Sequence, residues 1–518
     1  MRKSVLLIAV WIMSLSLAAQ KQINIHTDSG IESHLIEEDD YAGFNEDQSL
    51  FQLFLVTGNY DYSVSEIDSI TFTLMEEHII TINYNGDNVS VTNPLAGNGI
   101  EIEVTNADVI VTSTIDEKYI TYKLTGSTSD GTFKIYSDNH YNLVLDGLEI
   151  INPDGPALNL QSGKNVNIIL EPGTINTLTD GAVYADPPGE EDQDGTLFCE
   201  GDIEFLGSGD LVINSFGDDQ HGIYSKDGIE IKEGTITVTS ATKDGVHGKD
   251  GVEISGGILS VTSSGDGIDA KNGVMEVKGG ETTIYSIMDD VKAMKTDSIV
   301  NISGGTIDII LEGNQSKGID ADQDIFIQGC EINITATGGV VLEASGSGYD
   351  PSYCSAISAN GNITFSNCII DISSSGEAGR GVACDGNISI AENSFMTIEA
   401  SGDGAKYTNE DGEDDAYHGS CLNADGDLLV SGGVINVSNS GDGGKGITVD
   451  GHIDIPDGDI TPELNVTTTG DPITITQGGG WGNPGEYDES KAVKADNRVT
   501  INNGILNIDS ADDGIKSD

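Results

Sequence analysis

The feature that most constrains the fold is an internal repeat that begins near Gly217. Its glycines Gly222, Gly245 and Gly267 stand 23 and 22 residues apart, and two consecutive copies read DGVHGKDGVEISGGILSVTSS and DGIDAKNGVMEVKGGETTIYS. Each copy holds three short runs that alternate apolar and polar residues, which is typical of strands with one buried face. No copy can bury that face alone, so the copies must stack in parallel. The sequence therefore predicts an all-β fold, a right-handed parallel β-helix (solenoid) of about a dozen turns with three short strands per turn.

The limits of the repeat suggest the domain organisation. Residues 1–19 have the pattern of a signal peptide, because Arg2 and Lys3 precede an apolar run and Ala18-Ala19 offers a cleavage site. The alternative is a membrane anchor, for which the run is short. Residues 20–85 do not repeat and are expected to form a small N-terminal accessory or capping module. Residues 86–518 form the predicted β-helix, and we expect its C-terminus to be truncated, since ADDGIKSD stops inside a repeat.

The charge of the chain limits its partners. It has 86 Asp and Glu against 23 Lys and Arg, a formal net charge of −63. Such a polyanion repels nucleic acid and anionic membranes, so we expect neither as a partner and no membrane insertion. The signal peptide predicts a secreted or cell-surface bacterial protein, and we expect a monomer.

The six cysteines are expected to be small apolar residues inside the fold. Cys199 and Cys384 stand where other copies carry Ala, and Cys330 and Cys368 occupy the same place in two successive copies. The alternative is a bridge between Cys330 and Cys368. No CxxC pair exists in the sequence, which argues against a cysteine zinc site or a redox site.

Four repeats are lengthened just before the Asp-Gly-Ile strand, by ADPPGEEDQDGTLF, ASGSGYDPSYCS, YTNEDGEDDAYHGS and QGGGWGNPGEYDES. Because they interrupt corresponding corners, we expect these inserts on one flank of the rod, where loops commonly bind ligands. Aromatic residues in or beside them either stack on sugar rings or fasten the loops to the rod. The candidates for carbohydrate contact here are Tyr407, Tyr417, Trp481 and Tyr487.

Stacked turns also align outward residues into ladders. The residue after the central Ile or Val of this strand is expected to give such a ladder, which includes Tyr184, Tyr224, His247, Asp269, Lys292, Asp320 and Lys494. Crowded carboxylates here and at the preceding corner would repel one another unless a cation joins them, and oxygen ligands favour Ca²⁺. The alternative is that Asp suits Asp-Gly corners by capping its own backbone. The predicted Ca²⁺ ligands are Asp244, Asp266, Asp269, Asp289, Asp290, Asp320, Asp512 and Asp513.

Two basic side chains lie within this acidic face. Lys292, with His247, could abstract a proton from a uronate whose carboxylate the metal polarises, which is lyase chemistry. The alternative is that they balance charge, and that Lys292 and Lys494 contact an acidic polysaccharide without catalysis. A lone Lys without a second basic partner is weak support for a lyase.

The repeats DGVHGKDGVEISGGILSVTSSGDGIDA and KAVKADNRVTINNGILNIDSADDGIKSD closely resemble the exported calcium-binding β-helix carbohydrate-binding domain family, over about residues 90–518. The resemblance implies a fold similar to that of pectate lyases, Ca²⁺ on the outside of the helix, and binding of plant cell-wall polymers such as polygalacturonate and cellulose. The aspartates that it carries over are Asp266, Asp269, Asp289, Asp290, Asp320, Asp512 and Asp513. The copies KGIDA, SAISA and RGVAC lack the corner Asp, so not every turn can hold a metal.

Three functions follow from these observations. The leading prediction is an exported, calcium-dependent, non-catalytic protein that binds an acidic, polygalacturonate-like polysaccharide. The alternatives are a calcium-dependent, pectate-type polysaccharide lyase and a structural surface adhesin.

Overall fold

The computed structural model describes residues 21–517 apart from 28–29, 37–40, 45–48, 56–57, 75–77, 116–119 and 477–484. Every long regular element in the described residues is a strand. The chain forms two compact units, Met1–Ile79 and Ile80–Asp518. The division falls slightly before the predicted boundary at residue 86, because β7 (Ile79–Asn85) pairs with β11 (Ile120–Thr128) of the larger unit. Among the described residues, no helix has the length and apolarity needed to cross a membrane.

The smaller unit consists of two antiparallel sheets. One orders β2 (Gly30–Ile36), β1 (Lys21–Thr27) and β6 (Ile67–Leu74), and the other β3 (Tyr41–Phe44), β4 (Leu50–Leu55) and β5 (Gly58–Ser63). Its core contains Ile23, Ile25, Phe51, Leu53 and Tyr62. The predicted signal peptide lies outside the described residues.

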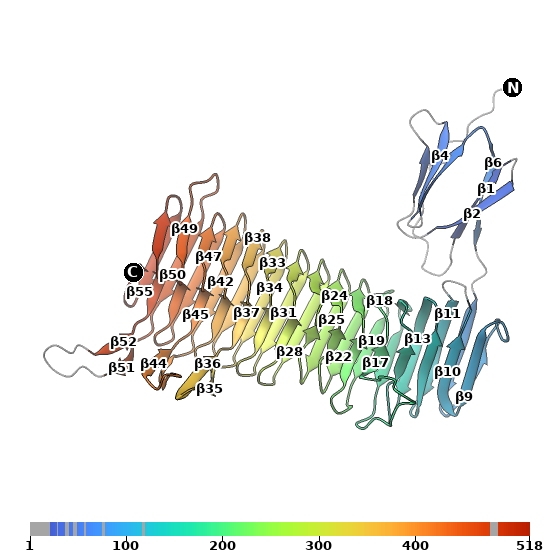
Figure 1. The fold of residues 1–518 in the computed structure, drawn as a ribbon, viewed down its shortest axis with the longest axis horizontal. Coiled ribbons are helices and arrows are strands. Elements are labelled where there is room, and N and C mark those ends of the chain that lie inside the picture. Colours follow the sequence, from blue (N-terminus) through green and yellow to red (C-terminus); the bar gives the residue numbers. More distant parts are fainter. Residues whose placement is uncertain are drawn as a thin grey trace. The chain divides into compact units, whose positions relative to one another are not determined.

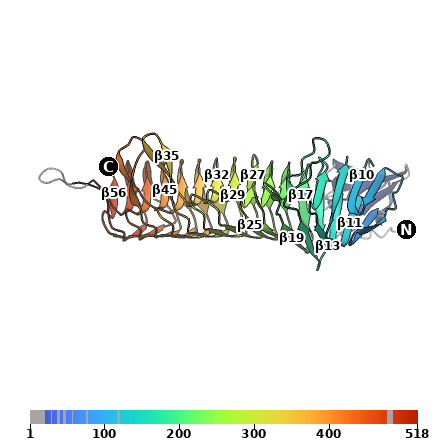
Figure 2. The same ribbon diagram turned by 90° about the horizontal axis from the view of Figure 1, so that it is seen from below.

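The larger unit is built from strands that pair in parallel with their counterparts one repeat away (Figures 1 and 2). One row runs from β15 (Val166–Leu170) to β54 (Arg498–Ile501), and a second from β16 (Ile175–Thr179) to β55 (Ile505–Ser510). A third row is a separate sixteen-stranded sheet, in which only the pair at one end is antiparallel. Long parallel sheets in an all-β chain are consistent with the predicted β-helix or solenoid. Its handedness and number of turns stay predictions.

The sixteen-stranded sheet carries the candidate site, and we call its solvent-facing side the ladder face. Its strands, in chain order, are β9 (Ile100–Thr105), β10 (Ala107–Ser113), β12 (Gly131–Ser137), β14 (Leu158–Gln161), β17 (Gly195–Cys199), β20 (His221–Ser225), β23 (Val246–Gly248), β26 (Ile268–Asp269), β29 (Lys292–Thr296), β32 (Lys317–Ala321), β37 (Ser355–Ala359), β40 (Arg380–Cys384), β45 (Ser420–Ala424), β48 (Lys445–Val449), β53 (Lys491–Ala495) and β56 (Ile515–Ser517).

One continuous core of Ile, Val, Leu and Ala fills the space between the three rows. Because side chains alternate along each strand, the inward residues of successive turns stack on one another. All six cysteines are free and buried, as the apolar interpretation predicts. Cys384, for example, pairs between Ala359 and Ala424. The alternative bridge between Cys330 and Cys368 does not form.

Candidate functional site

The register of the sheet places two rows of side chains on the ladder face. The first contains Phe198, Tyr224, His247, Asp269, Lys295 and Asp320, each paired with the next. The sequence analysis was wrong at two of these positions, where it expected Tyr184 and Lys292. Tyr184 precedes β17. Lys292 lies three residues before Lys295, because the chain takes three more residues from Ser286 to Lys295 than from Ser263 to Asp269 one turn earlier.

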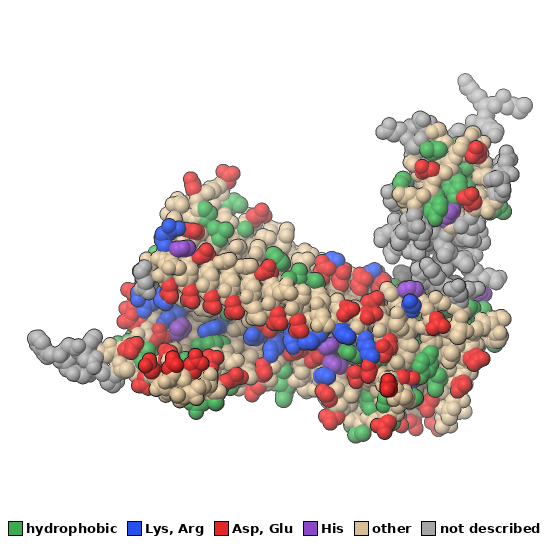
Figure 3. Space-filling view, viewed as in Figure 1, with side chains coloured by type: hydrophobic (Ala, Val, Ile, Leu, Met, Phe, Trp, Pro, Cys, Tyr) green, Lys and Arg blue, Asp and Glu red, His purple; other side chains and the backbone are tan. Residues whose placement is uncertain are grey.

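The second row lies three residues earlier in each turn. Lys292 pairs with Lys317, Lys317 with Ser355, and Ser355 with Arg380. Further along, Lys445 pairs with Lys491. Figure 3 shows Lys and Arg side chains gathered in a line along the larger unit, with Asp and Glu on either side. Eight of the chain's 23 basic residues belong to strands of this one sheet from β29 onward: Lys292, Lys295, Lys317, Arg380, Lys445, Lys491, Lys494 and Lys516.

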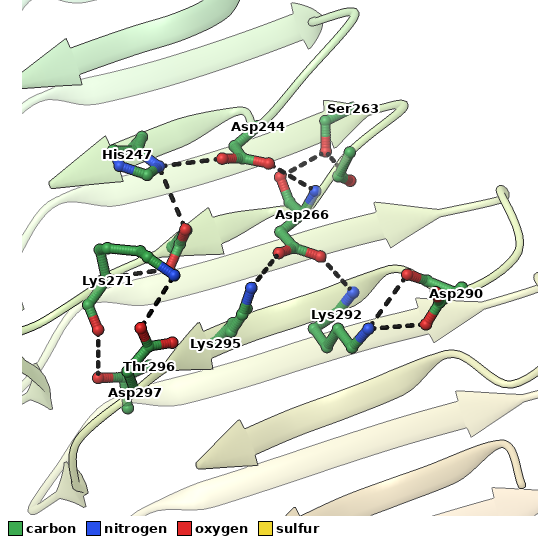
Figure 4. Close-up of polar contacts among 12 residues, drawn as sticks. Asp244, His247, Ser263, Asp266, Lys271, Asp290, Lys292, Lys295, Thr296 and Asp297 are labelled. Carbon is green, nitrogen blue, oxygen red and sulfur yellow. Dashed lines mark hydrogen bonds and ion pairs between the residues drawn. The ribbon is translucent and has the colours of Figure 1, made fainter. Parts of the chain in front are cut away.

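Lys292, Lys295 and Lys317 are solvent-exposed members of this line, and we call these three residues the lysine cluster. Lys292 Nζ lies 2.8 Å from Asp290 Oδ1, Lys295 Nζ 3.5 Å from Asp266 Oδ2, and Lys317 Nζ 3.2 Å from Asp320 Oδ1. Figure 4 shows the first two of these pairs side by side. The three lysine side chains keep 19%, 29% and 30% of their surface exposed, so solvent reaches them.

Next to the lysine cluster is a buried group of two histidines and a carboxylate, which we call the histidine cluster: His221, Asp244 and His247. Asp244 Oδ2 lies 3.0 Å from His247 Nδ1 and 3.3 Å from His221 Nδ1. Asp269 Oδ2 is 3.2 Å from the same nitrogen of His247. The ring of Tyr224 stacks on that of His221, with centroids 4.9 Å apart.

Burial and charge act in opposite directions on these groups. Burial disfavours the charged form of His247, but the carboxylates of Asp244 and Asp269 outweigh it and raise the pKa of His247 to about 8. Burial likewise opposes ionisation of Asp244, but the two histidines outweigh it and hold its pKa well below the usual range. At neutral pH His247 is therefore held as a cation, which is unsuitable for a general base.

The predicted Ca²⁺ ligands around the lysine cluster have protein partners. The Asp266 carboxylate accepts a hydrogen bond from the Lys292 backbone N–H at 2.7 Å, and Asp289 accepts one from Asn314 at 2.7 Å. Asp290 and Asp320 face Lys292 and Lys317. Lysines and backbone N–H groups thus relieve the crowding on which the Ca²⁺ prediction rested here, and these aspartates do not converge as one set of oxygen ligands.

The other predicted pair of aspartates does converge. Asp512 and Asp513 offer carboxylate oxygens within 4.8 Å of one another and of Glu489, an all-oxygen group of the chemistry that Ca²⁺ prefers. Lys491 Nζ lies beside this group, 3.0 Å from Glu489 and 3.9 Å from Asp512. Within the described ranges, the histidine cluster is the one other group of potential ligands this close together. Two imidazoles fit Ca²⁺ poorly.

Three of the four inserts form hairpins that contact one another beside the ladder face. They are β35–β36 (Val341–Ser345 and Gly348–Ser352), β43–β44 (Ala405–Thr408 and Asp414–Tyr417) and β51–β52 (Ile473–Thr476 and Glu486–Asp488). Tyr349 bridges to Asn409, and the third hairpin contacts the second. This agrees with the expected common flank. The first insert lies over the other end of the sheet, where Glu191 contacts Lys134 and Tyr136.

Aromatic residues of these hairpins mostly fasten them to the rod. Tyr417 is 7% exposed and donates a hydrogen bond to Glu377, and its ring lies 5.8 Å from that of Tyr407. Tyr353 lies under the Arg380 guanidinium, 3.4 Å from ring centroid to Cζ. Tyr487 is exposed, whereas Trp481 lies outside the described residues.

The third hairpin is fastened by charge. Lys445 Nζ is almost completely buried and lies 2.6 Å from Asp488 Oδ1, while His418 Nδ1 lies 2.7 Å from Asp488 Oδ2. Burial disfavours ionisation of Asp488, but His418 and Lys445 outweigh it and lower its pKa to about 2. At the next turn, Lys494 Nζ pairs with Asp496 at 2.7 Å.

Sequence reasoning missed His221, Lys295 and Lys317 as site residues. Aligning HGIYS with DGVHG and DGIDA places His221 at the corner occupied by Asp244 and Asp266, so a signal for His221 was present. Lys295 was hidden by the long corner before β29. Lys317 is the first residue of the copy KGIDA, where it replaces the corner Asp; that copy was considered for Asp320 and for the missing Asp.

Comparison with known proteins identifies relatives that contain a carbohydrate-binding domain. A carbohydrate-binding domain-containing protein from Acetivibrio thermocellus is 29% identical over 120 residues, which span 23% of this chain and 41% of that relative's length. A solved structure of a polysaccharide lyase-like protein from C. thermocellum, a gadolinium derivative, is 26% identical, covers 49% of this chain and 96% of its own, and has a TM-score of 0.40. A family model matches residues 105–347 and 352–518. The chain belongs to the family described as carbohydrate-binding domain-containing proteins.

Proposed function

We propose that this protein is an exported, non-catalytic binding protein for an acidic polysaccharide of the polygalacturonate type, which lies along the ladder face. The observation that carries the proposal is the lysine cluster. A chain with net charge −63 repels polyanions in general, so a line of exposed lysines is where a polyanionic chain would approach. Successive turns repeat at about 4.8 Å, which suits a linear polymer that presents a carboxylate at regular intervals.

Lysine and carboxylate pairs within the protein do not prevent this binding. Each lysine of the cluster is partly exposed and paired mainly with one protein carboxylate. An ammonium group has three N–H donors, so it can take up a ligand carboxylate beside the protein partner.

Calcium forms the second part of the proposal. Glu489, Asp512 and Asp513 are the residues that would hold Ca²⁺, because their donors are all carboxylate oxygens and lie close together. Bound there, Ca²⁺ would reverse the local sign of the charge and extend the line of cations beyond Lys491.

Isothermal titration of polygalacturonate into the purified protein tests the proposal. The variant Lys295→Gln/Lys317→Gln removes two charges from the ladder face. Hydrogen bonds to charged groups contribute about 1.5–3 kcal/mol each, so we expect affinity to fall by at least about 10-fold. The matched control is Lys232→Gln/Lys278→Gln, which removes two lysines paired with glutamates on another row of strands. The control should bind within about 2-fold of the unmodified protein.

Three further measurements separate the alternatives. Equal affinity in both double variants would refute the role of the lysine cluster. Repeating the titration with chelator tests Ca²⁺, and unchanged affinity would remove calcium from the proposal. Ultraviolet absorbance of unsaturated uronate should stay flat, and a rise that Lys292→Gln abolishes would make the protein a lyase. Absence of binding in every condition would leave the structural adhesin.

A further inference from the structure

The histidine cluster joins two consecutive turns of the sixteen-stranded sheet, those of β20 and β23. His221 begins β20, Asp244 lies at the corner before β23, and His247 is in β23. Their ligand atoms lie within 4.8 Å of one another. Neither the family description nor the lysine cluster explains why two imidazole rings, with centroids 4.6 Å apart, meet a shared carboxylate here.

The spacing of the donor atoms matches a tetrahedral metal site. Bonds of about 2.0–2.1 Å to a tetrahedral Zn²⁺ place neighbouring ligand atoms about 3.3 Å apart. Asp244 Oδ2 lies 3.0 Å from His247 Nδ1 and 3.3 Å from His221 Nδ1. The two imidazole nitrogens lie within 4.8 Å of each other, so side-chain rotation is what would bring the three atoms around one ion.

A second observation concerns His221 alone. The residue is 2% exposed, and its Nδ1 faces the cluster, where its contact with Asp244 Oδ2 at 3.3 Å lacks the geometry of a hydrogen bond. A buried nitrogen without a hydrogen bond costs free energy unless another ligand is bound to it. The ring cannot turn away easily, because Tyr224 stacks on it at an interplanar angle of 11°. The nitrogen is thus held toward the position that a metal would occupy.

We propose that His221, Asp244 and His247 bind a divalent transition-metal ion of the Zn²⁺ class. Two imidazoles and one carboxylate are borderline donors that select such ions over Ca²⁺ and Mg²⁺. Three protein ligands leave a fourth position for a water molecule or for Asp269, whose Oδ2 lies 3.2 Å from His247 Nδ1. The histidine cluster adjoins the lysine cluster through Asp266, whose backbone N–H donates to Asp244 and whose carboxylate accepts from Lys292.

Titration of the metal-free full-length protein with Zn²⁺, in excess Ca²⁺ and Mg²⁺, tests this site. The excess ions saturate weak binding to the many surface carboxylates. We expect one Zn²⁺ per chain under these conditions, and visible absorption bands of a low-coordinate Co²⁺ complex when Co²⁺ replaces it. The variants His221→Gln and His247→Gln should each weaken Zn²⁺ binding by more than about 100-fold, since loss of even an outer-sphere partner costs about 10–100-fold.

The control variant is His140→Gln, which changes a histidine in the loop before β13 (Tyr141–Ile151) and should bind Zn²⁺ like the unmodified protein. Far-UV circular dichroism establishes that each variant is folded. Zn²⁺ should also raise the Tm of the unmodified and His140→Gln proteins but not of the other two. Loss of binding in excess Ca²⁺, or equal binding by all folded variants, would overturn the assignment. If the zinc assignment fails, the proposed polysaccharide binding is unaffected, because that binding is measured without Zn²⁺.

Discussion

The ion cluster under the third hairpin gives a prediction whose size can be worked out from the structure. The change is Asp488→Asn, which keeps the shape of the side chain and removes its charge. Asp488 faces Lys445 at 2.6 Å and His418 at 2.7 Å, and the side chain is only 17% exposed. Lys445 would then be a buried cation without a carboxylate partner, although its hydrogen bonds to Gly443 O and Glu489 O remain.

Two estimates of the cost agree in order of magnitude. The pKa of Asp488 falls from an ordinary 3.8 to about 2, which corresponds to about 2.5 kcal/mol of stability at neutral pH. Removing one partner of a buried ion pair typically costs about 3–5 kcal/mol. We therefore expect Asp488→Asn to lower the free energy of unfolding of this region by about 2.5–5 kcal/mol.

The pH dependence has a definite sign. Because the pKa is lower in the folded state, the contribution of Asp488 is complete above the ordinary pKa of 3.8 and disappears as the pH falls through about 2. The unmodified protein should lose stability of the third hairpin across this window. Asp488→Asn should lack that part of the acid dependence, since the amide does not titrate.

Urea unfolding at neutral and acid pH measures both effects. The fluorescence of Trp481, in the chain between β51 and β52, reports on the hairpin, since the other tryptophan, Trp11, lies in the predicted signal peptide. Far-UV circular dichroism reports on the β-strands as a whole. In a solenoid the transition seen by fluorescence need not coincide with the transition seen by circular dichroism. The control is Asp454→Asn, whose exposed pair with Arg498 at 4.0 Å should contribute at most about 1 kcal/mol. Fluorescence midpoints of Asp488→Asn that match those of the control would refute the reasoning.

Two further predictions concern the stacking of turns. Gly273→Ala should lower the free energy of unfolding of the larger unit by about 1–3 kcal/mol, because a Cβ there would lie 1.8 Å from the Asp250 carbonyl oxygen. Urea unfolding measures this change. Gly163→Ala is the control and should unfold like the unmodified protein, because a Cβ at that position meets nothing within 4 Å. The six buried thiols should react with a thiol reagent only after unfolding, because burial raises the pKa of groups such as Cys330 to about 12. A reductant should leave the Tm unchanged, because all six cysteines are free. Rapid labelling of the native protein would contradict this second expectation.

The sequence by itself determined which residues face the core. Alternation in runs such as ITVTS identified strands like β22 (Thr235–Ser240), and equivalence with Ala placed Cys384 inside. The sequence also indicated that the three hairpin-forming inserts lie on one flank, because each interrupts the same corner of its repeat. Such features depend on short-range periodicity, which stacking of the turns preserves.

The tertiary structure decided which charges meet. The strand pattern does not reveal the length of each corner, so the sequence alone placed Lys292 where the register has Lys295. This error of three residues matters because the two lysines have different partners: Lys292 pairs with Asp290, whereas Lys295 pairs with Asp266. Likewise, the contact of Asp244 with His221 arises between turns, from residues that are more than twenty positions apart. A solenoid tolerates extra residues at its corners without losing its strands, and for that reason the pairing of side chains across turns is set only when the chain is stacked.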